Sequence, residues 1–224
     1  MWMSRELVTI TPEAPVSFAV VAMSRHKVRR LLVAHETLEG PHLVGIVTSA
    51  DVMRAFPADV NPFSSRAGEV KLTHQVVDVM TRPARTVVPD TPIEEAARLM
   101  RRHKIGALPV VEGPRLVGII TESDVFRAFI EVIGVEARGV RVTFELGEDE
   151  DAIATVLLIA KRHNMRVASF FSLHHSDARD LTERRLGVVR LVGDASEAVV
   201  EAIWRSGHRV VSVLPLSPDP SAAR

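Results

Sequence analysis

Cysteine and tyrosine are absent from the 224 residues, and aromatic residues make up only 4% of them. Without cysteine the chain holds no disulfide, no thiolate metal site and no cysteine nucleophile. The sparse aromatic residues offer no stacking platform for single-stranded nucleic acid. Charge of one sign is not in excess either, because 28 basic residues balance 28 acidic ones. This balance argues against a protein whose main ligand is a phosphate backbone.

Long apolar runs are missing as well. The longest largely apolar run spans residues 152–160, far short of the roughly 20 residues that a membrane helix needs. Residues 1–6 lack the basic start and apolar core of a signal peptide. A hydrophobic content of 46% is nevertheless ample for packed cores. We therefore expect a folded cytoplasmic protein that binds neither membrane nor nucleic acid.

An internal repeat organises the first half of the sequence. Many residues of the segment 3–31 recur in the segment 80–108, a shift of 77 positions. After a loop the shift becomes 73, and the segment 40–46 recurs as 113–119, so the first copy carries four extra residues. Matches this dense in one register, with a single gap, indicate a duplicated structural unit.

Each copy is predicted to hold a strand, a helix, two consecutive strands and a second helix. In the second copy, residues 85–88 are expected to form the first strand. Ile93 and Met100 lie on one face of the predicted helix that follows, with Thr91 as its cap and Pro92 at its first position. Because so small a unit cannot bury its sheet face alone, we expect the two α/β copies to pack on each other about a pseudo-twofold axis.

A hydroxyl residue and an aspartate recur where the last strand of each copy meets its second helix. Thr48 and Asp51 in the first copy correspond to Thr121 and Asp124 in the second. Backbone N–H groups and the positive end of the helix dipole at such a junction can hold a phosphate. A carboxylate one turn further on can accept hydrogen bonds from both hydroxyls of a ribose. The same spacing is that of a capping box, so the motif could instead serve helix stability alone.

Three segments of the second copy, 86–89, 103–111 and 116–124, resemble the motifs of the cystathionine-β-synthase-type (CBS) domain. The pair of copies resembles a Bateman module over about residues 2–134. The resemblance implies that an adenine nucleotide (AMP, ADP or ATP) binds as a regulatory ligand in two clefts between the copies. No tightly bound cofactor is expected.

The residues expected to bind the nucleotide come from both copies. Ala107, Leu108 and Pro109 are apolar strand residues suited to sandwich the base, and Arg29 and Arg30 could serve a phosphate or merely face solvent. The full set is Thr9, Arg29, Arg30, Leu31, Thr48, Asp51, Thr86, Ala107, Leu108, Pro109, Thr121 and Asp124. The first copy departs from the family pattern, because Leu32 replaces the usual proline.

The C-terminal third repeats nothing from the first two. Residues 139–215 are predicted to follow the order β-α-β-β-α-β of ferredoxin-like folds, with Asp194 as the cap of the second helix. This part resembles an ACT-type regulatory domain, and its exposed sheet edges favour dimerisation. The loop 147–151 carries four acidic residues, which disfavour an amino-acid effector through repulsion of its carboxylate.

These features predict a non-enzymatic regulatory protein. No nucleophile–base set is recognisable, and no metal site is expected. The whole architecture resembles the acetoin-utilisation accessory family, which suggests a homodimer acting on an unidentified protein partner. The alternative is a dimeric scaffold whose clefts stay empty. The expected domains are CBS domain 1 at 1–58, a linker at 59–75, CBS domain 2 at 76–134, an ACT-like domain at 139–215 and a flexible tail at 216–224.

Overall fold

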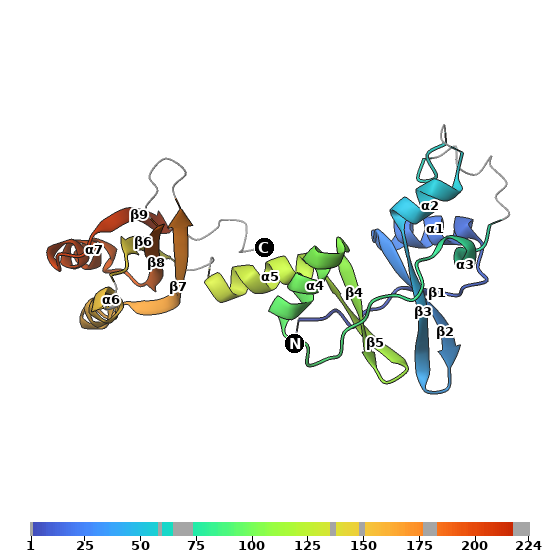
Figure 1. The fold of residues 1–224 in the computed structure, drawn as a ribbon, viewed down its shortest axis with the longest axis horizontal. Helices are drawn as coiled ribbons and strands as arrows, with labels where there is room; N and C mark the ends of the chain where they lie inside the picture. The colour runs from blue at the N-terminus through green and yellow to red at the C-terminus, as the bar shows by residue number, and fades with distance from the viewer. Residues whose placement is uncertain are drawn as a thin grey trace. The chain divides into compact units, whose positions relative to one another are not determined.

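The computed structural model describes residues 2–57, 60–64, 74–134, 138–147, 151–176 and 183–216. Within it the chain divides into two units, Met1–Ala128 and Phe129–Arg224 (Figure 1). Most of the predicted linker and tail, and residues 148–150 of the acidic loop, lie outside the described residues.

The first unit contains both copies of the repeat. The elements of the first copy are β1 (Thr9–Ile10), α1 (Val16–His26), β2 (Arg30–Thr37), β3 (Gly40–Thr48) and α2 (Ser49–Ala55). Those that follow are α3 (Val76–Val79), α4 (Ile93–His103), β4 (Ala107–Glu112), β5 (Arg115–Thr121) and α5 (Glu122–Ile133), which runs past the boundary of the unit. The strands form one mixed sheet in the order β1-β2-β3-β5-β4, in which β3 and β5 pair at His42 and Arg115.

The two copies exchange their N-terminal segments in a reciprocal way. Ser4 pairs with Ile119 on β5, with N···O distances of 2.9 and 3.0 Å. Thr81, the repeat equivalent of Ser4, pairs with Ile46 on β3 at 2.9 and 3.1 Å. Ile46 is in turn the equivalent of Ile119. This reciprocity is the pseudo-twofold relation that the sequence repeat predicts.

Each copy has its own core, and a third cluster joins them. Val16, Ala19 and Met23 of α1 are buried on their own sheet face, and Ala96 and Met100 of α4 are buried likewise. This confirms the predicted face of α4, on which Met100 is buried and Ile93 partly buried. A further buried cluster combines side chains from both copies: Leu32, Ala34 and Leu116. The apolar sheet face of one copy is thus covered by the other, as the size of the unit requires.

Two local predictions for the second copy are wrong. Helix α4 is capped by Pro92 without a side-chain hydrogen bond, because the Thr91 hydroxyl accepts instead from the Val88 N–H at 3.1 Å. The segment 85–88 forms no strand of its own, and only Val87 makes a parallel bridge, to Val110. The Thr91 hydroxyl and N–H both bond within the turn to Val88, so this hydroxyl does not cap α4, and backbone pairing with β4 is confined to Val87.

The second unit follows the predicted element order. Its elements are β6 (Gly139–Glu145), α6 (Asp151–Arg162), β7 (Arg166–Ser176), β8 (Glu183–Val192), α7 (Ser196–Arg205) and β9 (Val210–Leu216). The four strands form an antiparallel sheet in the order β7-β8-β6-β9, which is ferredoxin-like. The relation to ACT domains stays a prediction. Asp194 is not the cap of α7, because that position falls on Ala195.

The longest helices of the described residues, α5 and α6, have 12 residues each. No described helix combines the length and apolar character needed to cross a membrane.

Candidate functional site

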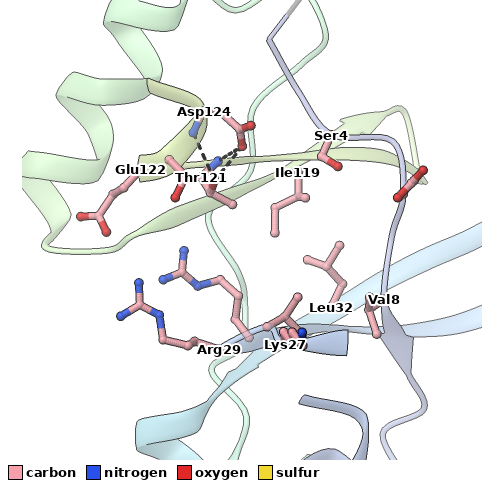
Figure 2. Close-up of a pocket in the computed structure, with 13 residues that line it drawn as sticks. Ser4, Val8, Lys27, Arg29, Leu32, Ile119, Thr121, Glu122 and Asp124 are labelled. Carbon is pink, nitrogen blue, oxygen red and sulfur yellow. Dashed lines mark hydrogen bonds between the residues drawn. The ribbon is translucent and has the colours of Figure 1, made fainter. Parts of the chain in front are cut away.

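One cleft lies between the two copies, where β5 ends and α5 begins. We call it the Thr121 cleft, and its volume is about 400 Å³. Thr121, Glu122 and Asp124 line it from the second copy, and residues of the segment 27–32 line it from the first. Figure 2 shows these two sets of side chains on opposite sides of the cavity. A cavity of this size suits a small-molecule ligand.

Asp124 is only 5% exposed and is held by Thr121. Its carboxylate accepts hydrogen bonds from the Thr121 backbone N–H at 2.8 Å and from the Thr121 hydroxyl at 2.7 Å. The Asp124 N–H donates back to the hydroxyl oxygen at 3.4 Å, and the second carboxylate oxygen accepts from Arg127. The capping interpretation is therefore confirmed. The same carboxylate also lines the cleft, so capping does not exclude contact with a ligand.

A second cleft occupies the pseudo-symmetric position. We call it the Thr48 cleft, and its volume is about 340 Å³. Nine of the twelve residues that line it have a repeat equivalent among the residues that line the Thr121 cleft. The pairs are Thr48 with Thr121, Ile46 with Ile119, Thr81 with Ser4, Arg85 with Val8, Lys104 with Lys27, Ile105 with Val28, Gly106 with Arg29, Ala107 with Arg30 and Pro109 with Leu32.

Asp51 repeats the arrangement of Asp124 in the first copy. It is 6% exposed, and its carboxylate accepts from the Thr48 backbone N–H at 2.8 Å and from the Thr48 hydroxyl at 2.6 Å. Arg54 donates to the other carboxylate oxygen. Thr48 lines the cleft whereas Asp51 does not. A ligand in this cleft would therefore have to pass the side chain of Thr48 to contact the Asp51 carboxylate.

The structure brings together seven of the predicted binding residues at the two clefts. Arg29, Arg30, Thr121 and Asp124 line the Thr121 cleft, and Arg30, Thr48, Ala107 and Pro109 line the Thr48 cleft. Thr9, Leu31, Asp51, Thr86 and Leu108 line neither.

The expectation that Leu31 and Leu108 face the ligand needs correction. Both side chains are buried in the core of their own copy, with exposures of 0% and 1%. Successive side chains of a strand point to opposite faces of the sheet. Arg30 and Leu32, the neighbours of Leu31, therefore face the cleft while Leu31 faces the helices, and Ala107 and Pro109 flank Leu108 in the same way.

Arg30 lies between the clefts and lines both. Its guanidinium donates to the carbonyl of Gly106, where an added Cβ would lie 2.8 Å from Arg30 Nη2 and 2.7 Å from Glu122 Oε2. Burial lowers the pKa of Arg30, nearby Glu122 raises it, and Arg29 lowers it further. A half-buried cation with one neighbouring carboxylate thus stands where the second copy has the uncharged Ala107.

His103 brings a further basic group to the Thr48 cleft. Its pKa is lowered from the ordinary histidine value, first by desolvation and then by the positive charges of Arg85 and Arg102. An anion in the cleft would oppose this effect, because it favours the charged imidazolium.

Two lysines adopt a backbone conformation that normally favours glycine. Lys27 and Lys104 end α1 and α4 with φ of 54° each, in the left-handed region. Glycine is the usual residue at such a helix end, and the left-handed region costs other residues about 1–2 kcal/mol. Each lysine lines one cleft. The unfavourable backbone conformation therefore coincides with a possible role of the charged side chain.

Five charged lining residues were missed by sequence reasoning: Glu6, Lys27, Arg85, Lys104 and Glu122. The recurrence of Lys27 as Lys104 was a signal that could have identified this pair. Arg85 and Glu122 have no such signal, because the repeat places Val8 and Ser49 at the equivalent positions.

The fold and the clefts define a pseudo-symmetric pair of α/β domains with a candidate ligand site in each of two equivalent clefts. The chain belongs to the CBS domain family, whose model matches residues 1–58 and 76–131, about half of the sequence.

Individual comparisons agree with this family. A CBS domain-containing protein of Dictyostelium discoideum is 32% identical over 133 residues, which cover 58% of this chain and 90% of that protein. A homoserine O-acetyltransferase of Methanococcoides burtonii is 37% identical over 126 residues, 56% of this chain but only 22% of the enzyme. The chain therefore spans about a fifth of the length of that enzyme.

Among solved structures, the CBS domain pair of protein MJ0100 in complex with 5′-methylthioadenosine and S-adenosyl-L-methionine is similar to this chain. The identity is 27% and the TM-score 0.45, and the match covers 57% of this chain and 90% of that one.

Proposed function

We propose that this chain is a non-enzymatic regulatory protein that binds adenine nucleotides in the Thr121 and Thr48 clefts. The observation that carries the proposal is the duplication of one site. In each cleft a threonine bonded to a buried aspartate lies at a strand-to-helix junction, with a lysine in a left-handed conformation among the lining residues. Membership of the CBS family favours an adenosine ligand for such a pair of clefts.

In the Thr121 cleft the parts of a nucleotide find suitable partners. The first-turn N–H groups of α5, a helix of 12 residues, and the cations Lys27 and Arg29 suit the phosphate. Apolar side chains suit the base: Val8, Val28, Leu32 and Ile119. The Asp124 carboxylate suits the ribose hydroxyls once Arg127 releases the carboxylate oxygen to which it donates a hydrogen bond. Arg127 is largely exposed, so its release costs little.

The proposal is tested by calorimetric titration with AMP, ADP, ATP and S-adenosylmethionine. Asp124→Ala and Asp51→Ala are each expected to weaken one of two sites about tenfold or more, because each removes a charged acceptor of the sugar hydroxyls. Arg127→Ala and Arg54→Ala are the matched controls: they remove the ion pair, leave the capping box and are expected to bind at least as well as the parent.

Circular dichroism should show the same fold for all four variants. Unchanged affinity in both aspartate variants would remove these residues from the site. If no nucleotide binds at millimolar concentration, the chain is the dimeric scaffold with empty clefts.

We further propose that the ACT-like second unit makes the protein a homodimer and transmits nucleotide occupancy to a protein partner. Strand β9 is an edge of its sheet, and Trp204, Val211 and Leu214 are exposed beside it on α7 and β9. Edges and apolar patches of this kind favour association. Light scattering at high protein concentration is expected to give twice the chain mass of 24.6 kDa, and the mass of a single chain would contradict dimerisation.

The cytoplasmic location, the link to acetoin utilisation and the domain boundaries at 1–58, 76–134 and 139–215 remain part of this proposal. The link to acetoin utilisation follows from the family resemblance of the sequence, and the domain boundaries follow from its repeat and its predicted element order.

A further inference from the structure

The two clefts differ in charge at equivalent positions. Arg85 of the Thr48 cleft replaces Val8 of the Thr121 cleft, and Glu122 of the Thr121 cleft replaces Ser49. The backbone frame of the two clefts is the same, because the exchanged N-terminal segments and the capping boxes recur in both. The clefts therefore differ in their side chains, among which Arg29 of the Thr121 cleft has Gly106 as its equivalent in the Thr48 cleft.

The formal charges of the lining residues show the size of this difference. Three cations of the Thr121 cleft (Lys27, Arg29 and Arg30) face three carboxylates (Glu6, Glu122 and Asp124). The Thr48 cleft is lined by three cations (Arg30, Arg85 and Lys104) and, among the described residues that line it, by no carboxylate. If Asp124 is counted as neutralised by its partner Arg127, one net positive charge remains in the Thr121 cleft against three in the other.

A net charge of this kind selects ligands by their own charge. Several cations around a cavity raise the local concentration of anions and the affinity for them. The guanidinium of Arg85 in addition suits bidentate contact with phosphate. Arg30 adds to this field, since its half-buried guanidinium reaches the Gly106 carbonyl at the wall of the Thr48 cleft. Carboxylates such as Glu6 and Glu122 instead repel additional phosphate groups from the Thr121 cleft.

We propose that the Thr48 cleft is the polyphosphate site of this protein and that the Thr121 cleft takes an adenosine ligand of low net charge. This inference rests on the proposed function, because it assigns a ligand class to each of the two clefts. It predicts that one molecule can hold two different adenosine ligands at once.

Two equivalent isoleucines report on the clefts separately. Ile46 lines the Thr48 cleft and Ile119 the Thr121 cleft. In methyl-labelled full-length protein, NMR titrations with ATP and with uncharged 5′-methylthioadenosine, without added magnesium, give a Kd at each methyl group. We expect ATP to bind at least tenfold more tightly than 5′-methylthioadenosine at Ile46, and a ratio below threefold at Ile119. Raising the salt concentration should weaken ATP mainly at Ile46.

Repeat-swap variants show which cleft each binding curve belongs to, because both isoleucines also pack against the core shared by the copies. Arg85→Val places in the Thr48 cleft the valine that the Thr121 cleft has at the equivalent position, Val8. This variant should reduce the preference for ATP at Ile46 about fivefold or more. Val8→Arg combined with Glu122→Ser should create a preference for ATP at Ile119. These changes affect exposed or half-buried positions, so the fold should be kept.

The outcomes separate this inference from the proposed function. If ATP and 5′-methylthioadenosine bind with the same ratio at both methyl groups, or if ATP prefers the Thr121 cleft, the charge assignment is overturned while nucleotide binding stands. If neither ligand perturbs either methyl group at millimolar concentration, nucleotide binding itself fails.

Discussion

Gly45→Ala is expected to lower the free energy of unfolding of the first unit by about 2–3 kcal/mol, the upper range for overpacking a tight contact. A Cβ at Gly45 would lie 2.8 Å from the backbone oxygen of Thr81 and 2.9 Å from Met80 Sδ. The backbone oxygen cannot move away, because both the N–H and the carbonyl of Thr81 are hydrogen-bonded to the backbone of Ile46. The substitution therefore forces apart the two copies at the wall of the Thr48 cleft.

Gly118 is the repeat equivalent and provides a matched control. A Cβ there would lie 2.4 Å from Met3 Sδ, a flexible side-chain atom, and 3.2 Å from the Ser4 backbone oxygen. Because the methionine can move, Gly118→Ala should cost no more than about 1 kcal/mol. An equal or larger loss in Gly118→Ala would contradict this account of the contact.

Urea unfolding measures both variants. The chain has two tryptophans, Trp2 and Trp204, which lie in different units. In a Trp204→Phe background the fluorescence of Trp2 reports the first unit alone, and a lower midpoint with an unchanged slope indicates a loss of stability.

Lys104→Gly is expected to stabilise the protein and to weaken its binding of ATP. Glycine removes the cost of the left-handed conformation, which should raise the free energy of unfolding by about 0.5–1 kcal/mol once the greater freedom of glycine in the unfolded chain is subtracted. The loss of one of three cations lining the Thr48 cleft should weaken ATP about tenfold, the effect of one charged contact.

Lys104→Ala separates the two effects. It removes the charge but keeps a side chain at φ of 54°, so it should lose the same affinity without the gain in stability. Urea midpoints and calorimetric titration with ATP on the three proteins are sufficient. An affinity for ATP that is unchanged in both variants would show that the charge of Lys104 has no role in binding.

Features encoded within one copy were predictable from the sequence. The repeat itself indicated the pseudo-twofold pair, and the spacing of Ile93 and Met100 indicated a helix face that the structure confirms. The Thr121–Asp124 spacing indicated a capping box, whose bonds are now seen. Helix starts were less predictable: Thr91 and Asp194 suit a cap, but in each case the cap position falls on the next residue, Pro92 and Ala195.

Features that depend on two copies meeting were not predictable. Arg30 could be named as a candidate for phosphate contact, but not as a residue shared by both clefts. Leu31 and Leu108 were included among the ligand residues, Leu108 as an apolar strand residue suited to sandwich the base. Their burial in the core of their own copy shows that they face the helices instead.

The sequence by itself determined that two similar units exist, that each carries a hydroxyl–carboxylate pair at a helix start, and that an unrelated β-α-β-β-α-β unit follows. These properties arise from contacts between residues a few positions apart, so they can be read from spacing. Only the tertiary structure decided which charges gather in each cleft and why glycine is needed at position 45. Both depend on atoms that come from different copies. The differences between Arg85 and Val8 and between Glu122 and Ser49 can be read in the sequence, but which cleft they affect is known only once the two copies are packed together.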